Sequence, residues 1–143
     1  MPGFQTTVGT QPAPAVEGDF ASKNPRGVVL AGPGGLVAGA LGTYIARFGW
    51  LSYEGIDADS APAKGNNYGA GAPSGLCARE QQGLITTYLA ESGMLIPGGF
   101  MVTLFNHVDL WVKNNNASAA ALNGQKCWAG NLDGKTYFAA AGG

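Results

Sequence analysis

The sequence predicts a mainly β protein: a small, single-domain β-sandwich or barrel-like module over residues 27–143, preceded by an extended N-terminal arm over residues 1–26. Two observations favour this fold class. Apolar residues alternate with other residues along several short runs, and this period of two is that of a pleated strand. Turn-forming residues separate the runs, with 24 glycines and 8 prolines in 143 residues. A chain of this length suffices for one domain with a core of its own.

Charged residues are scarce, at 12% of the chain, which is about half the usual share. The 8 lysines and arginines and the 9 aspartates and glutamates form no long run of one sign, so we expect neither nucleic acid nor a membrane as a partner. A surface this poor in charge suits contact with other proteins. The N-terminus lacks the basic start and apolar stretch of a secretory signal, and no apolar run reaches the roughly 20 residues of a membrane span. We therefore expect a protein made in the cytoplasm.

The first 26 residues show no apolar period, and four prolines favour an extended backbone there: Pro2, Pro12, Pro14 and Pro25. Three apolar side chains, Phe4, Val16 and Phe20, are spaced along this segment like anchors. Two interpretations stay open. The segment is either a frayed terminus or an arm that becomes ordered by lying across a neighbouring subunit.

Residues 27–42 are glycine-rich and superficially resemble a dinucleotide-binding loop, in which glycines let the backbone approach a pyrophosphate. That motif needs a helix after the loop, and Gly39 and Gly42 would each cost such a helix about 1 kcal/mol. No second βαβ unit follows. The segment is therefore predicted to form two short strands that flank a glycine turn.

Alternation returns in residues 43–53, where Tyr44, Ala46, Phe48 and Trp50 would share one face of a single strand. Residues 54–75 are predicted to be a long polar loop, with Ile56 and Tyr68 as its only apolar anchors. Its acidic residues Asp57 and Asp59 resemble the opening of a calcium loop, but the glycine and glutamate that should follow are missing.

The longest regular pattern runs from Val102 to Val112, where every even position except Asn106 is apolar. Because Asn106 and His107 interrupt the middle of this run, we expect two strands, about 100–105 and 108–113, folded into a hairpin over a tight turn. Pro97-Gly98-Gly99 would form the turn that precedes it. Residues 84–89 favour a third strand, and a helix over 80–91 is the alternative.

The C-terminal part is predicted to hold a low-complexity connector, 114–124, and two final strands, 125–130 and 135–140, joined by a turn at 131–134. Cys77 and Cys127 match no metal-binding spacing, so we expect two reduced, buried thiols. A single disulfide is the alternative.

No residue pattern points to catalysis. His107 is the only histidine, no serine or cysteine stands in a recognisable nucleophile motif, and a zinc site would lack ligands. Glu80 and Glu91 flank the predicted third strand, but carboxylates so placed are typical of a solvated surface. We therefore expect no enzyme, no cofactor and no metal.

Four blocks of sequence are similar to the structural cement proteins that decorate the heads of tailed bacteriophages: VEGDFASKNPR (16–26), GPGGLVAG (32–39), ARFGW (46–50) and REQQGLITTYLAESGMLIPGGFMVTLFNHVDLWVKN (79–114). The resemblance covers roughly residues 16–140, and its last block is the most specific. It implies a non-enzymatic protein on the outer surface of the virion. Such a protein would clamp neighbouring subunits of the major capsid protein once the head has expanded, often as a homotrimer.

Aromatic and arginine side chains commonly dominate the energy of protein interfaces. On this basis we expect seven residues to contact the capsid or a neighbouring copy: Phe4, Val16, Phe20, Asn24, Arg26, Trp50 and Trp111. The two tryptophans are expected at a subunit boundary rather than in a core. Two other functions stay open, namely another virion component, such as a head fibre or a minor tail protein, and a small carbohydrate-binding β module.

Overall fold

The computed structural model describes residues 9–10, 15–32, 34–52, 62–80, 93–117 and 119–139. These ranges hold ten strands and no helix, which confirms the mainly β fold class. The strands are β1 (Gly27–Val28), β2 (Leu36–Ala38), β3 (Thr43–Tyr44), β4 (Phe48–Ser52), β5 (Ala63–Asn66), β6 (Gly75–Cys77), β7 (Leu95–Ile96), β8 (Leu104–His107), β9 (Lys126–Ala129) and β10 (Thr136–Ala139). In the described part of the chain, therefore, no helix is long and apolar enough to cross a membrane.

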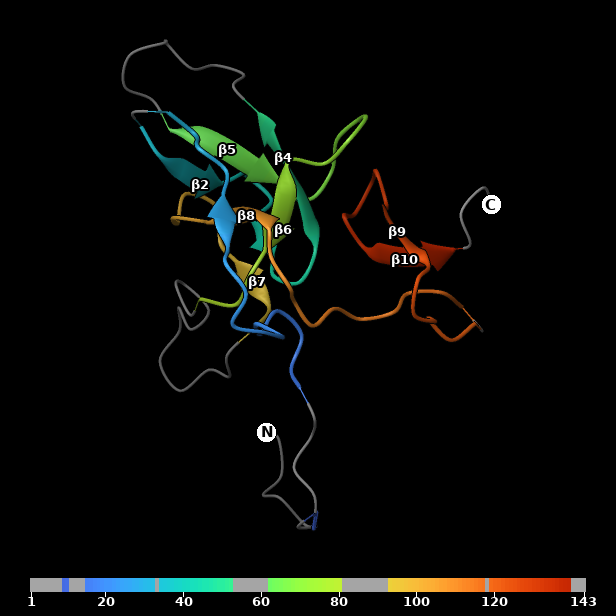
Figure 1. Ribbon diagram of the computed structural model, residues 1–143. Helices are drawn as coiled ribbons and strands as arrows, with labels where there is room; N and C mark the ends of the chain where they lie inside the picture. Colours follow the sequence, from blue (N-terminus) through green and yellow to red (C-terminus); the bar gives the residue numbers. More distant parts are fainter. Residues whose placement is uncertain are drawn as a thin grey trace, which may run out of the picture.

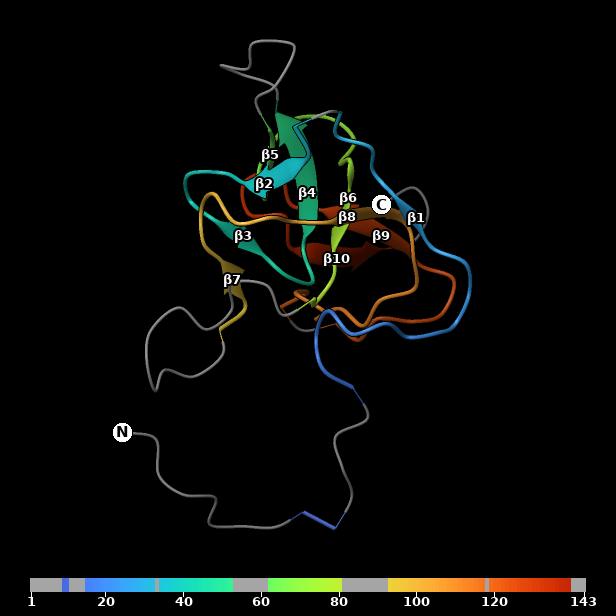
Figure 2. The same ribbon diagram turned by 90° about the vertical axis from the view of Figure 1, so that its left-hand side faces the viewer.

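Six of the strands form one sheet in the order β1-β8-β6-β4-β5-β2 (Figure 1). The pairing of β2 with β5 is parallel, and all the other pairings in this sheet are antiparallel. Two ribbons of two strands each accompany it, β3 with β7 and β9 with β10. Figure 2 shows the β3–β7 ribbon beside one end of β2 and β4.

The six-stranded sheet closes on itself. The outer edge of β2 bonds to residues 100–102, through Ala38 N–H to the Phe100 carbonyl at 2.8 Å and Val102 N–H to the Leu36 carbonyl at 3.0 Å. Residues 100–102 lead directly into β8, which lies near the other end of the strand order. One extended segment thus pairs with β2 first and with β6 next, and the fold is a small barrel.

The barrel surrounds a core of small and aliphatic side chains: Leu36, Ala38, Ile45, Ala63, Cys77, Ile96, Val102 and Leu104. These residues come from strands far apart in the sequence and from the β3–β7 ribbon. Strand-to-strand spacing in so narrow a barrel leaves room for few large side chains, which explains why alanines share the interior with leucines and isoleucines.

The hairpin predicted over 100–113 is wrong. Asn106 and His107 lie inside β8, and Gly27 of β1 stands opposite His107. Residues 108–113 form no strand with 100–105, because 109–111 pair with the N-terminal segment instead. Gly18 N–H donates to the Trp111 carbonyl, Trp111 N–H to the Asp19 carbonyl and Ala21 N–H to the Asp109 carbonyl. The alternating sequence pattern indicates which side chains of this segment share a face. It does not indicate which other segment pairs with it.

Two further predictions need correction. The strand expected over 43–53 is broken between β3 and β4, because Ala46 has a φ of 59°, which an extended backbone does not adopt. The loop expected over 54–75 contains β5 and the start of β6. In β5 the small residues Ala63 and Gly65 are buried and Lys64 is exposed, so the strand alternates without any large apolar residue.

Several predictions are confirmed. Two short strands, β1 and β2, flank a glycine turn in which Gly32 and Gly35 have positive φ. Pro97–Phe100 forms a turn, and β9 pairs with β10. Both cysteines are free, as expected, but Cys127 is exposed and only Cys77 is buried. Burial raises the pKa of the Cys77 thiol to about 12. The strand or helix expected over 80–91, apart from Glu80, and the residues Asp57 and Asp59 lie outside the described residues.

Candidate interaction surface

Three of the predicted contact residues come together on the chain's own barrel. The Phe20 ring meets Phe105 edge-to-face with 5.5 Å between centroids, and the Arg26 guanidinium lies 3.5 Å from the centroid of Phe20. Asn24 donates a hydrogen bond of 2.7 Å to the Asp109 carboxylate. Residues 15–26 therefore pack along 105–111 in the same chain.

The other predicted contact residues are spread over the molecule. Val16 and Trp111 are partly exposed, and Phe4 lies outside the described residues. Trp50 is only 6% exposed and packs within the chain. Of the two tryptophans, Trp111 is the one with surface that a neighbouring subunit could cover.

The contact between the N-terminal segment and Asp109 is expected to depend on pH. Hydrogen bonds from Ser22 and then from Asn24 lower the pKa of the Asp109 carboxyl below its ordinary value of 3.8. A lowered pKa in the folded state means that the contact is fully stabilising above the unfolded pKa and is lost as the pH falls through the folded value. We expect the side-chain amide signals of Asn24 to shift on acidification from about pH 5 to about pH 2, when followed by NMR. In Asp109→Asn this transition should be absent, and a wild-type protein without it would contradict the assignment.

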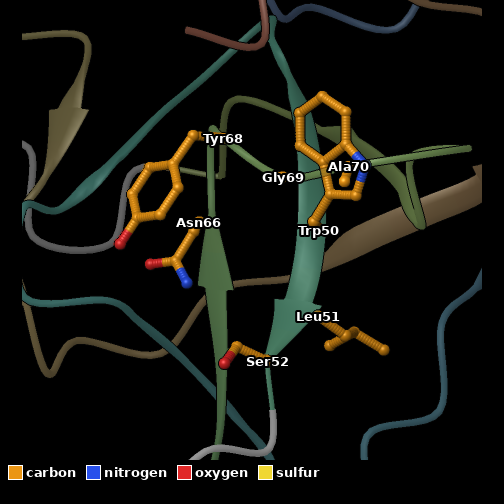
Figure 3. Close-up of a pocket in the computed structure, with 7 residues that line it drawn as sticks. All are labelled: Trp50, Leu51, Ser52, Asn66, Tyr68, Gly69 and Ala70. Atoms are coloured by element: carbon orange, nitrogen blue, oxygen red, sulfur yellow. The ribbon is translucent and has the colours of Figure 1, made fainter. Parts of the chain in front are cut away.

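A hollow of about 260 Å³ lies between β4 and the segment after β5, lined by Trp50, Leu51, Ser52, Asn66, Tyr68, Gly69 and Ala70 (Figure 3). Its aromatic and polar lining is of the kind that binds sugars. However, Gly69 lies against the Trp50 indole so closely that an added Cβ would collide with the ring. The indole Nε1 also donates to the Gly71 carbonyl at 3.3 Å. Because this ring is covered and only 6% exposed, it offers no stacking face for a sugar.

Four large side chains stand exposed around a second hollow, of about 160 Å³. They are Leu41 (75% exposed), Tyr44 (38%), Tyr68 (47%) and Leu132 (92%), and we call them the apolar patch. They come from the turn before β3, from β3 itself, from the segment after β5 and from the β9–β10 turn. Apolar side chains gathered in this way on a surface are typical of a protein contact.

Two turns present the leucines of the patch. Gly42 N–H donates to the Gly39 carbonyl at 2.8 Å, which places Leu41 at the tip of a tight turn. Gly42 has a φ of 78°, and a Cβ there would lie 2.7 Å from the Ile96 carbonyl oxygen, so only glycine fits. Leu132 lies within the β9–β10 turn, which Gly69 N–H fixes to the barrel through the Asn131 carbonyl at 2.9 Å.

Beneath the patch, Asn67 fixes the backbone around Tyr44. Its side-chain oxygen accepts a hydrogen bond of 2.6 Å from Tyr44 N–H, and its amide donates to the Phe48 carbonyl at 3.0 Å. The residue is only 7% exposed. One asparagine thus joins β3, β4 and the segment after β5, and the patch stands on a rigid base.

Beside the patch lies a third hollow, of about 310 Å³, which we call the cationic hollow. Its charged lining consists of Arg47, Lys113, Lys135 and Glu17, and its apolar lining of Tyr44, Ile45, Ala46 and Met94, with Asn115 completing it. Arg47 and Tyr44 line both this hollow and the one in the apolar patch, so the two hollows are neighbours.

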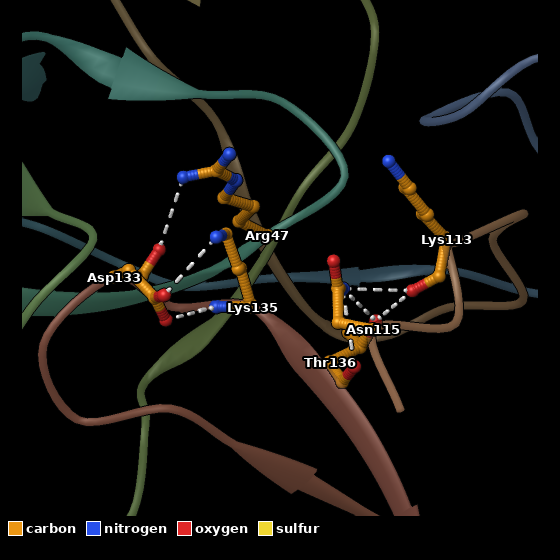
Figure 4. A network of polar contacts seen from close by, with 6 residues as sticks. All are labelled: Arg47, Lys113, Asn115, Asp133, Lys135 and Thr136. Atoms are coloured by element: carbon orange, nitrogen blue, oxygen red, sulfur yellow. Dashed lines mark hydrogen bonds and ion pairs between the residues drawn. The ribbon is translucent and has the colours of Figure 1, made fainter. Parts of the chain in front are cut away.

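Polar contacts hold the C-terminal hairpin against this region (Figure 4). Asn115 donates to the Thr136 carbonyl at 3.1 Å, and the Thr136 hydroxyl donates to the Lys113 carbonyl at 2.5 Å. Asn116 donates to the Phe138 carbonyl at 2.7 Å. The asparagine-rich connector therefore pairs with the outer edge of β10, a role that its low-complexity composition did not indicate.

The sequence interpretation missed both the patch and the hollow. One signal was available: Leu132 is a large apolar residue in the predicted turn 131–134, where polar residues are usual. Leu41 was assigned to no turn. The cations gave no signal, because Arg47, Lys113 and Lys135 are far apart in the sequence and meet only through the fold. Among the described residues, no group of three or more histidine, cysteine, aspartate or glutamate side chains is placed to hold a metal ion.

A family model described as the XM1 gp53 minor capsid protein matches residues 4–143, which is nearly the whole chain. No curated protein and no solved structure shows significant similarity to it. The chain therefore belongs to the XM1 gp53 minor capsid protein family and is a structural protein of a bacteriophage capsid.

Proposed function

We propose that this protein is a capsid cement protein, which binds the outer surface of the head and clamps neighbouring subunits of the major capsid protein. The observation that carries the proposal is the apolar patch. Its two leucines are 75% and 92% exposed, and backbone hydrogen bonds hold the turn that carries each of them. Because the backbone of these turns is already held, little backbone conformational entropy is lost when a partner covers the two side chains, which favours binding.

The rest of the surface agrees with this role. Charged residues are only 12% of the chain, and depletion of charge is typical of the buried centre of an interface. A homotrimer would present three apolar patches to the capsid lattice, and such avidity would let each single contact be weak. We propose that the protein acts by contact alone, without catalysis.

The test is a double substitution, Leu41→Ser with Leu132→Ser, measured by co-sedimentation with purified, expanded heads that lack the protein. Burying one leucine side chain contributes about 1.5–3 kcal/mol, so we expect the affinity for heads to fall at least tenfold. Both side chains are largely exposed, so the thermal unfolding midpoint should stay near that of the wild type.

The matched control is Leu122→Ser, because Leu122 is 67% exposed on the connector and lies outside the patch. It should bind heads like the wild type. Equal binding by the double variant and the control would refute the proposed site. Saturation of the wild type at only a few copies per head would indicate a head fibre or minor tail component instead.

A further inference from the structure

We propose that the cationic hollow binds a carboxylate side chain from an acidic segment of the capsid subunit that covers the apolar patch. This inference rests on the proposed function, because it assigns a second contact to the same partner. Three of the chain's 8 lysines and arginines line this one hollow, in a protein of net charge −1.

The charges in the hollow are only partly balanced within the chain. Lys135 lies 3.5 Å from the Asp133 carboxylate, and Arg47 donates to the Asp133 carbonyl at 3.4 Å while lying 4.2 Å from the centroid of the Tyr44 ring. Lys113 forms no ion pair with any residue that the structure describes, and neither does Glu17. Lys113 is therefore the cation best placed to meet a charge from outside.

Size and lining indicate the kind of ligand. A volume of about 310 Å³ is at the lower limit of small-molecule sites, and it suits one or two side chains of a peptide better than a nucleotide. Tyr44 and Met94 supply an apolar wall that can contact the methylene groups of a glutamate or aspartate. The lysine ammonium groups and the arginine guanidinium at the rim then donate charge-assisted hydrogen bonds to the carboxylate.

Position identifies the partner. Arg47 and Tyr44 separate the hollow from the apolar patch and belong to both. A protein that covers Leu41, Leu132 and the Tyr44 ring lies next to the hollow, because Tyr44 and Arg47 also line it. An apolar centre with a charged contact at its margin is the usual arrangement of a protein interface.

The experiment measures the affinity of the full-length protein for purified, expanded heads that lack it, at low and at high salt. Lys113→Glu is expected to weaken binding at least tenfold at low salt and to flatten its salt dependence, because the attraction that salt screens has been removed. Glu17→Gln should bind about two- to fivefold tighter, since Glu17 is the one anionic side chain among the described residues that line the hollow. A general loss of structure would weaken binding in both variants. It would not explain weaker binding in Lys113→Glu together with tighter binding in Glu17→Gln.

Lys64→Glu is the matched control, because Lys64 is an exposed lysine on β5 outside the hollow and the change in net charge is the same. It should bind within twofold of the wild type. Equal affinities for Lys113→Glu and Lys64→Glu would overturn the inference. A wild type that fails to bind heads at all would instead reject the proposed function.

Discussion

Leu104→Ala is expected to lower the free energy of unfolding by about 3–5 kcal/mol, since a fully buried leucine at the centre of a small core leaves a cavity that cannot collapse. Leu104 is 0% exposed and lies in β8, where the closing segment 100–107 turns from β2 to β6. Urea denaturation of the two proteins measures the difference. Leu122→Ala, at a position 67% exposed, should change stability by less than about 0.5 kcal/mol.

The space that Leu104 fills is made by glycine. A Cβ on Gly49 of β4 would lie 2.8 Å from Leu104 Cδ2, and one on Gly65 of β5 would lie 3.9 Å from Leu104 Cδ1. Gly49→Ala alone should therefore overpack the core and cost about 1–3 kcal/mol. Combined with Leu104→Ala, the new methyl group would enter the cavity, so the double variant should lose less stability than the sum of the two single losses.

Additive losses in this cycle would contradict direct packing of Leu104 on Gly49. A loss below about 1 kcal/mol in Leu104→Ala would contradict the central position of this leucine in the core. The comparison depends only on differences between variants, so the extent of structure in the unfolded chain affects it little.

Local pairing in this fold could be predicted from the sequence, and distant pairing could not. The β9–β10 hairpin was predicted because its strands are neighbours in the chain and a short turn joins them. The closure of the barrel was not predicted, because it depends on the pairing of β2 with residues 100–102, which are far away in the sequence. Strand β5 was not predicted, because its inward-facing residues are the small Ala63 and Gly65. Where the backbone itself fills the interior, the hydrophobic pattern that reveals a strand is missing.

Contacts between residues that are distant in the sequence also explain why the predicted contact residues differ from the apolar patch. Phe20, Asn24 and Arg26 were expected to contact a neighbour, since a sequence cannot show which surface an aromatic side chain will meet. The structure gives Phe20 a partner in its own chain, Phe105. The apolar patch, by contrast, arises from tips of turns brought together by the barrel and the hairpin. Leu41 and Tyr44 are far from Tyr68 and Leu132 in the sequence, so no short stretch of sequence predicts that they meet.

Gly134→Val is expected to release the C-terminal hairpin from the barrel and thereby to abolish binding to heads. Gly134 has a φ of 66°, which a β-branched residue does not tolerate, and its carbonyl accepts the hydrogen bond of 2.8 Å from Phe48 N–H. A Cβ at this position would collide with the Phe48 carbonyl oxygen and approach the Asn67 carbonyl oxygen to 3.0 Å. The hairpin carries Leu132 and Lys135, so its release would dismantle both the apolar patch and the cationic hollow.

Amide hydrogen exchange measures the release. In Gly134→Val the amides of β9 and β10 should lose protection, because a two-stranded ribbon is at best marginally stable alone. The amides of β6 and β8, and those of β4 other than Phe48, should keep theirs, since their bonds lie within the barrel. The Phe48 amide should lose protection with the hairpin, because it donates to the Gly134 carbonyl. Gly124→Val is the matched control: its φ is 85°, but nothing lies within 4 Å of an added Cβ. Gly124→Val should lose stability because valine does not favour a positive φ. Its β10 amides should stay protected, and it should bind heads like the wild type. Loss of binding in both variants would show that backbone strain, and not the docking of the hairpin, controls the interaction with the capsid.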